Sequence, residues 1–318
     1  MTATSRMRSA VAVVGLAGGL GVGVGYGGRS LLRRQAATAR RIIGKPLGEQ
    51  ALDADKVYRK RYGDAVDLLV LGDSIAAGLG AEVPGDTFGA RLAKMVAKRE
   101  ERSVRLRTAA RVGAESSMLA EQVASLPPSY RAAVAVVIVG GNDVTHRVPV
   151  AESARHLAEA IEALQARGTA VVVGTCPDLG ALRPVPQPLR ALGSRASRQL
   201  AAAQRATAVA AGARAVSLAD VVGPFFITNP DEMFSLDRFH PSAAGYKRTA
   251  RAVLPSVLAA LGRVDEVPFG HHAPEPSPEP SPEVEPAAEP VVAAVDIDDW
   301  GIDDQVAGGV SDGSDRVS

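Results

Sequence analysis

Between about Asp64 and Gly262 the chain alternates short apolar runs with longer amphipathic segments, and this alternation restricts the fold most. Continuous apolar runs of this length predict strands that are buried on both faces of a sheet. The expected strands are Val66–Leu71, Val104–Thr108, Ala133–Val139 and Ala170–Gly174. The expected helices are Phe88–Arg102, Met118–Leu126, Ser153–Arg167, Ser194–Ala211 and Ser242–Leu261. Together they predict an α/β fold, a three-layer α/β/α sandwich with a mostly parallel, doubly wound sheet.

A serine follows the first expected strand directly, in the run Gly72-Asp73-Ser74-Ile75. Ligands of doubly wound sheets bind beyond the carboxyl ends of the strands, so Ser74 lies where a site is expected. A serine hydroxyl is a weak nucleophile, and it needs an adjacent base and donors for an oxyanion. Taken alone, this serine is equally well explained as a helix cap.

Two further loops follow later strands. After Ala133–Val139 comes Gly140-Gly141-Asn142-Asp143, where glycines permit close backbone approach and the asparagine amide could donate to an oxyanion. After Val104–Thr108 comes a loop with Gly113, whose N–H could serve the same oxyanion. Ordinary turns are the alternative explanation for both loops.

An aspartate and a histidine stand three residues apart in the run Asp237-Arg238-Phe239-His240-Pro241, just before the last expected helix. At this spacing a carboxylate can fix the imidazole tautomer while the other ring nitrogen faces a serine. A surface ion pair is the simpler alternative, but the position after the last strand-like segment favours a base for Ser74.

These four motifs, in this order, resemble the blocks of the GDSL/SGNH hydrolase superfamily, and the resemblance covers the whole region 64–262. It implies a flavodoxin-like sheet of the SGNH-hydrolase type. It also implies that Ser74 is the nucleophile, His240 the general base and Asp237 its orienting acid. The N–H groups of Ser74 and Gly113 and the Asn142 amide would then form the oxyanion hole. The first block reads G-D-S-I instead of G-D-S-L, and the second lacks the asparagine usual before its glycine.

The predicted function is therefore hydrolysis of a small-molecule or lipid ester, without a metal or cofactor. An acyltransferase using the same triad is one alternative, and a membrane-tethered, non-catalytic binding protein is another. Four residues near the expected cleft are candidate substrate contacts: Asp178, Arg183, Phe225 and Phe226. Arg183 belongs to the proline-rich run Arg183–Arg190, which predicts a loop or lid.

The amino-terminal segment, residues 1–35, contains an uncharged stretch from Ser9 to Gly28 that is long enough for a bilayer span of roughly 20 residues. Arginines follow it before any small-residue cleavage site, which favours an uncleaved anchor over a signal peptide. The prediction is a membrane-anchored or exported protein, with the side of the membrane left open. Residues 36–63 are then a basic, partly helical connector.

Residues 263–318 form a Pro/Glu-rich, acidic segment. This composition predicts a disordered tail, because proline and like charges oppose a packed core. Around Trp300 this tail could hold a protein-docking motif, although a solvated tail is the simpler explanation. The net charge of +1 and the 4% aromatic content argue against a nucleic-acid partner. The single cysteine, Cys176, excludes an intrachain disulfide.

Overall fold

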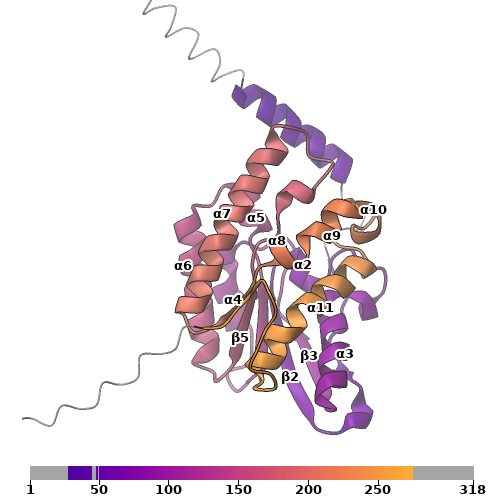
Figure 1. The fold of residues 1–318 in the computed structure, drawn as a ribbon, viewed down its shortest axis with the longest axis vertical. Helices are drawn as coiled ribbons and strands as arrows, with labels where there is room; N and C mark the ends of the chain where they lie inside the picture. Colours follow the sequence, from indigo (N-terminus) through magenta and orange to yellow (C-terminus); the bar gives the residue numbers. More distant parts are fainter. Residues whose placement is uncertain (1–27, 45–47, 49, 275–318) are drawn as a thin grey trace, which may run out of the picture. The chain divides into compact units, whose positions relative to one another are not determined.

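The computed structural model describes residues 28–44, 48 and 50–274. Its centre is a seven-stranded sheet with the order β1-β3-β2-β4-β5-β6-β7 (Figure 1). The five inner strands are parallel, and the two outermost strands run antiparallel to their neighbours. The strands are β1 (Val57–Tyr58), β2 (Ala65–Gly72), β3 (Ser103–Thr108), β4 (Val134–Ile138), β5 (Ala170–Gly174), β6 (Arg214–Val216) and β7 (His271–His272).

The parallel strands, taken in chain order, lie in the spatial order 2-1-3-4-5, which is the flavodoxin-like arrangement. The predicted fold class is thereby confirmed. In this arrangement the chain passes from β2 to its neighbour β3 on one side. It then returns to β4 on the other side of β2, and β5 and β6 continue in that direction. The point of reversal lies between β2 and β4, and ligands of doubly wound sheets bind beyond the carboxyl ends of the strands at this point.

Helices cover both faces of the sheet (Figure 1). The long helices α3 and α11 pack together on one face, and α4, α6 and α7 pack on the other. Among the labelled helices, α2, α5, α8, α9 and α10 are short and lie in the connections. The helices are α2 (Ser74–Ala77), α3 (Phe88–Glu100), α4 (Leu119–Ala124), α5 (Gly141–His146), α6 (Val150–Gln165), α7 (Leu189–Ala210), α8 (Leu218–Val221), α9 (Gly223–Thr228), α10 (Pro230–Met233) and α11 (Ala243–Ala260). Short 3-10 turns are η1 (Lys60–Tyr62), η2 (Pro84–Asp86), η3 (Ser116–Met118) and η4 (Leu179–Ala181).

The alternating side chains of the inner strands belong to two separate hydrophobic cores, one on each face of the sheet. Along β2, Leu68 and Val70 face the α3–α11 layer, whereas Leu69 and Leu71 face the layer of α4 and α6. All four side chains are fully or almost fully buried. Successive strand residues point to opposite faces, so an uninterrupted apolar run is what a sheet covered on both sides requires.

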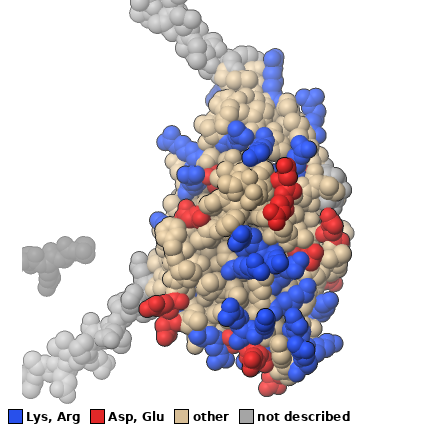
Figure 2. Space-filling model, turned by 45° about the vertical axis from the view of Figure 1, so that its right-hand side comes forward, with Lys and Arg blue, Asp and Glu red and all other residues tan. Residues whose placement is uncertain are grey.

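The charged residues of helices α3 and α11 are almost all basic. Helix α11 contains no acidic residue, and the single acid of α3, Glu100, pairs with Arg263 at 2.8 Å. Figure 2 brings this side forward and shows Lys and Arg side chains gathered on it. The basic residues on the two helices are Arg91, Lys94, Lys98, Arg99, Lys247, Arg248 and Arg251. The basic and acidic residues of this near-neutral chain are therefore not evenly distributed among its helices.

The sheet extends beyond the predicted limits of the folded domain. Strand β1 comes from the predicted connector 36–63, and β7 comes from the predicted tail 263–318. Helix α7 begins at Leu189, inside the run Arg183–Arg190 that was expected to be a loop. Proline is tolerated before and within the first turn of a helix, because the N–H that it lacks has no helical partner there.

The membrane prediction falls mostly on residues that the structure does not describe. The stretch Ser9–Gly28 lies outside the described residues except for Gly28, and the tail around Trp300 lies outside them too. A helix over residues 28–43 crosses the predicted boundary between segments 1–35 and 36–63. In the part of the chain that is described, no helix is long and apolar enough to cross a membrane. Anchoring and localisation remain predictions.

Candidate active site

Ser74 lies at the end of β2, where the backbone turns sharply into α2. The turn is made by Gly72, whose φ is +127° and whose position leaves no room for a side chain. The next residue, Asp73, donates its N–H to the carbonyl of Ile138 on β4 at 3.0 Å and caps α2 by accepting from Ile75 N–H at 2.9 Å. Ser74 is therefore the first residue of α2, and it is only 7% exposed.

His240 joins Ser74 to Asp237 through two short contacts. Its Nε2 lies 2.9 Å from Ser74 Oγ, and its Nδ1 lies 2.6 Å from Asp237 Oδ2. The other oxygen of Asp237 accepts from the N–H groups of Phe239 and His240, both at 2.9 Å. A carboxylate held in this way keeps Nδ1 protonated, which leaves Nε2 free to accept from the serine. The structure thus brings together the three residues that the sequence selected.

Asp237 remains ionised in this environment. Burial alone would raise its pKa, but hydrogen bonds from the His240 imidazole and from the two backbone N–H groups outweigh burial and hold the pKa below its ordinary value. An ionised carboxylate next to Nδ1 can stabilise positive charge on an imidazole ring.

The loop that carries Asp237 and His240 is closed at its base and packed against the α2 side of the site. Ser235 N–H donates to the carbonyl of His240 at 2.8 Å. Gly80, with φ +109°, lies so close to the loop that a Cβ would fall 2.4 Å from the Pro241 carbonyl oxygen. From α11, the Tyr246 hydroxyl donates to the Leu79 carbonyl at 2.5 Å. These contacts fix the distance between the serine and the histidine across 166 residues of sequence.

Asn142 and Gly113 lie on adjoining loops. Asn142 is the second residue of α5, which begins three residues after the end of β4, and its Nδ2 donates to the carbonyl of Ala114 at 2.9 Å. That carbonyl belongs to the residue after Gly113, so the two predicted oxyanion donors come from chain segments in direct contact. Within the described residues, neither Ser74 N–H nor Gly113 N–H donates to another group of the protein.

Two buried glutamines, which sequence reasoning missed, hold the strand ends in place. Gln122 forms two hydrogen bonds with Gly72, one to its N–H and one to its carbonyl, both at 2.8 Å. Gln204 donates to the Val139 carbonyl at 2.9 Å and accepts from Cys176 N–H at 2.7 Å. A signal was present in the sequence, because each glutamine falls on the apolar face of its helix, three or four residues from a buried leucine.

Asp73 is fully buried beneath the serine, and its carboxyl group has an unusual pKa. Burial raises this pKa to about 6, although hydrogen bonds from Ile75 N–H and Gly141 N–H and the charge of His240 act against the rise. Because the folded protein holds this proton more tightly than the unfolded chain, stability falls as pH rises from about 4 to about 6.

We expect this loss of stability to be on the order of 3 kcal/mol. It is measured as a difference from Asp73→Asn, in which residue 73 does not titrate. Urea unfolding of both proteins at pH 4, 5, 6 and 7 measures it. The free energy of unfolding of the wild type should decline relative to that of Asp73→Asn across this range. Asp64→Asn, at an exposed position, should run parallel to the wild type. A constant difference between wild type and Asp73→Asn at all four pH values would show that Asp73 does not titrate here.

The four predicted substrate contacts have partners within the protein. Asp178 accepts from Gly180 N–H at 2.8 Å and pairs with Arg198 at 2.7 Å. Arg183 donates to the carbonyl of Ile227 at 3.2 Å. Phe225 lies beneath the Arg248 guanidinium, 3.5 Å from the ring centroid. Phe226 is buried and stacks edge-on against Phe234. Substrate binding by these four residues stays a prediction.

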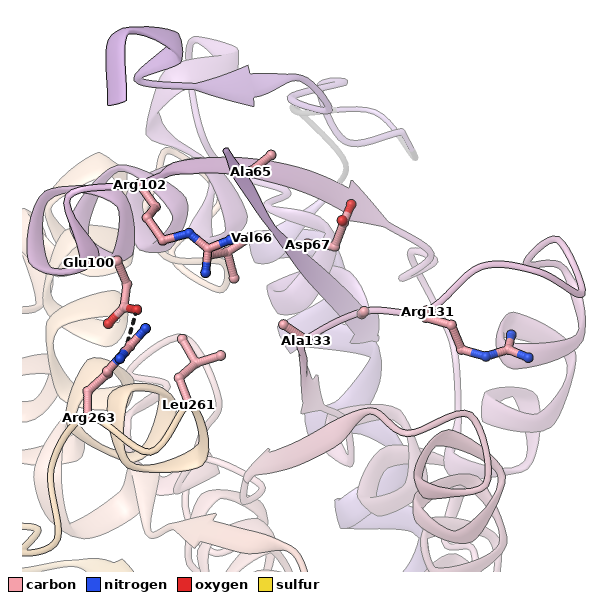
Figure 3. Close-up of a pocket in the computed structure, with 10 residues that line it drawn as sticks. Ala65, Val66, Asp67, Glu100, Arg102, Arg131, Ala133, Leu261 and Arg263 are labelled. Atoms are coloured by element: carbon pink, nitrogen blue, oxygen red, sulfur yellow. Dashed lines mark hydrogen bonds and ion pairs between the residues drawn. The ribbon is translucent and has the colours of Figure 1, made fainter. Parts of the chain in front are cut away.

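A cavity of about 360 Å³ lies away from Ser74, at the amino ends of β2 and β4 (Figure 3). Ala65, Val66 and Ala133, which begin or precede these strands, line it, and Arg102 and the Glu100–Arg263 pair form another part of its wall. Since Ser74 follows the carboxyl end of β2, this cavity belongs to the opposite edge of the sheet. Over residues 28–44 and 50–274, no three His, Cys, Asp or Glu side chains are grouped as metal ligands would be.

Known proteins resemble this chain in sequence and in structure. A model of the GDSL-like lipase/acylhydrolase family matches residues 70–248. The GDSL-like esterase Rv1075c of Mycobacterium tuberculosis is 36% identical over 283 residues, which are 84% of this chain and 88% of the relative. LAE5, an alpha/beta hydrolase enzyme from the metagenome of Lake Arreo, is 21% identical with a TM-score of 0.49, covering 64% of this chain and 99% of its own. A catalytic mutant of an acetylxylan esterase from Geobacillus stearothermophilus is 18% identical with a TM-score of 0.48, covering 63% and 95%. The family match spans all the motifs from Ser74 to His240.

Proposed function

The chain belongs to the GDSL-like lipase/acylhydrolase family and is a carboxylic ester hydrolase, and from this premise we propose that Ser74, His240 and Asp237 form its catalytic triad. The observation that carries the proposal is the unbroken pair of contacts from Ser74 Oγ to Nε2 and from Nδ1 to Asp237. A serine, a base and an orienting acid in hydrogen-bond contact are what nucleophilic acyl transfer requires.

In the first half of the reaction, Ser74 Oγ attacks the ester carbonyl carbon while His240 Nε2 accepts the hydroxyl proton. The tetrahedral intermediate carries its negative charge on the former carbonyl oxygen. His240 then returns the proton to the departing alcohol, and an acyl-serine remains. In the second half, water attacks the acyl group with His240 again as base, which releases the acid and restores Ser74.

The oxyanion is stabilised by three donors: the N–H groups of Ser74 and Gly113 and the amide of Asn142. Support comes from two observations. The two backbone N–H groups have no partner among the described residues, and one hydrogen of the Asn142 amide is committed to Ala114, which leaves the other for a ligand. Preorganised donors of this kind gain strength as charge develops on the oxygen.

The substrate of this site is a small-molecule or lipid ester. The mycobacterial relative is named an esterase, which supports the ester bond but leaves the acyl chain unspecified. Hydrolysis rates for a series of p-nitrophenyl esters, from acetate to palmitate, measure the preferred chain length.

A fluorophosphonate probe tests the proposal directly. The serine oxygen displaces fluoride from phosphorus, so the probe marks an activated serine and ignores ordinary ones. We expect one label per chain, located by mass spectrometry on the peptide that contains Ser74. Ser129→Ala, at an exposed serine, should label like the wild type, and Ser74→Ala should not label. Labelling that persists in Ser74→Ala would reject the proposed nucleophile.

A further inference from the structure

Three consecutive residues of the Gly113 loop are each held by a side chain from α5. Asn142 donates to the Ala114 carbonyl at 2.9 Å, and Asp143 accepts from Ser116 N–H at 3.1 and 3.2 Å. Between these two contacts, His146 Nδ1 lies 2.6 Å from Glu115 Oε1. The loop that carries one proposed oxyanion donor is thus fastened, residue by residue, to the helix that carries another.

Gly113 itself is exposed; its φ is +83°, and a Cβ built there would meet nothing within 4 Å. On the amino side of Gly113 the loop is held by Arg111, whose N–H donates to the Gly72 carbonyl at 3.0 Å. On the other side, the position of the Gly113 N–H depends on the contacts made by the residues that follow it. Of the three contacts, that of Asp143 is buried, and a further hydrogen bond from Ser153 Oγ at 2.7 Å fixes it. The contact of His146 lies at the surface, where the His146 side chain is 59% exposed.

The helix geometry couples His146 to the oxyanion hole. Residues four apart lie on the same face of a helix, so Asn142 and His146 of α5 point to the same side. A rotation of α5 that turned the Asn142 amide away from the oxyanion would also pull His146 from Glu115. The ring contact resists that rotation at the end of α5 opposite to Asn142.

We propose that Glu115 and His146 are positioning residues that set the distance between the Gly113 N–H and the Asn142 amide. The proposal rests on the proposed function, because it concerns the same oxyanion hole. Neither side chain is required to touch the substrate. Their effect is to keep two donors, from two separate loops, at the spacing that one oxygen atom needs.

Loss of this contact should lower kcat more than it changes KM, since the oxyanion forms only in the transition state. A displacement of catalytic groups by about 1 Å can lower the rate on the order of 100-fold. Loss of one surface contact should displace the donors less, and its effect on the rate should be about a tenth as large. We therefore expect about a 10-fold fall in kcat for Glu115→Ala and for His146→Ala. The double variant should fall no further than either single variant, because both remove one contact.

Two matched comparisons accompany these variants. Glu115→Gln keeps an oxygen that can accept from Nδ1–H, so it should retain most of the wild-type kcat. His156→Ala and Glu159→Ala break another His–Glu pair, on α6, with its atoms 3.2 Å apart and its histidine partly buried, and should leave kcat unchanged. Circular dichroism melting should be nearly the same for all of these variants.

Inhibition by a boronic acid distinguishes a positioning role from a merely structural one. The boronic acid adds to the serine and places an anionic oxygen in the oxyanion hole, so its inhibition constant should rise about 10-fold in both alanine variants. Unchanged kcat and boronate affinity in both variants would overturn the proposal, as would equal losses in Glu115→Gln and Glu115→Ala. Failure of the proposed function itself would look different, because the wild type would then neither hydrolyse esters nor react with fluorophosphonate.

Discussion

Ser74→Ala is expected to lower kcat for ester hydrolysis by about 10⁴-fold or more, while the protein keeps its wild-type melting temperature. Without Oγ no acyl-serine forms, and only the oxyanion donors and substrate binding remain to assist direct attack by water. The cavity created by removing one hydroxyl oxygen is small, and its partner His240 stays fixed by Asp237. Steady-state kinetics and thermal melting of the same preparations measure both quantities.

Removal of His240 should have an effect of similar size, because nucleophile and base act as one unit. His240→Ala combined with Ser74→Ala should therefore be no slower than Ser74→Ala alone. His156→Ala removes a partly buried histidine of α6 that does not contact Ser74, and it should retain full activity. A His240→Ala enzyme within 10-fold of the wild type would mean that another group takes the proton from Ser74.

The central strands could be predicted from the sequence because burial on both faces leaves an unmistakable apolar run. Strands β1 and β7 could not, because two residues are too few to show any period. Their pairing depends on neighbours more than 40 residues away in the sequence, Arg105 for Val57 and Ala215 for His272. Strand β6 has three residues, one of them charged, and it was missed for the same reason.

The candidate site was predictable to the extent that its chemistry is local. Asp237 and His240 are three residues apart, and their geometry follows from one turn of chain. The polar residues that support the site are distant in sequence from the groups they hold. Gln122 bonds to Gly72 from 50 residues away, and Gln204 bonds to Val139 from 65. Their role depends on which helix packs on which strand end, and the sequence pattern does not specify that pairing.

Gly72→Ala is expected to destabilise the protein more than any other single substitution considered. A Cβ at this position would lie 1.8 Å from the Ile138 carbonyl oxygen, an atom of the neighbouring strand's backbone. No side-chain rotation relieves such a clash, so β2 and β4 would have to separate where Ser74 and Asn142 are held. The left-handed φ of +127° adds backbone strain. We expect the free energy of unfolding to fall by more than about 3 kcal/mol and the activity to disappear with it.

Gly168→Ala separates the clash from the strain, because Gly168 also has a positive φ, +73°, but a Cβ there meets nothing within 4 Å. It should cost only about 1 kcal/mol, the penalty for an L-residue in the left-handed region. Urea unfolding of the two variants gives the difference, and ester hydrolysis at low temperature shows whether any folded Gly72→Ala is active. Equal losses of unfolding free energy in both variants would mean that the positive φ, and not the close approach of β2 to β4, requires glycine at position 72. If only Gly72→Ala loses most of its stability, the contact between β2 and β4 that leaves no room for a side chain is what holds Ser74 in position.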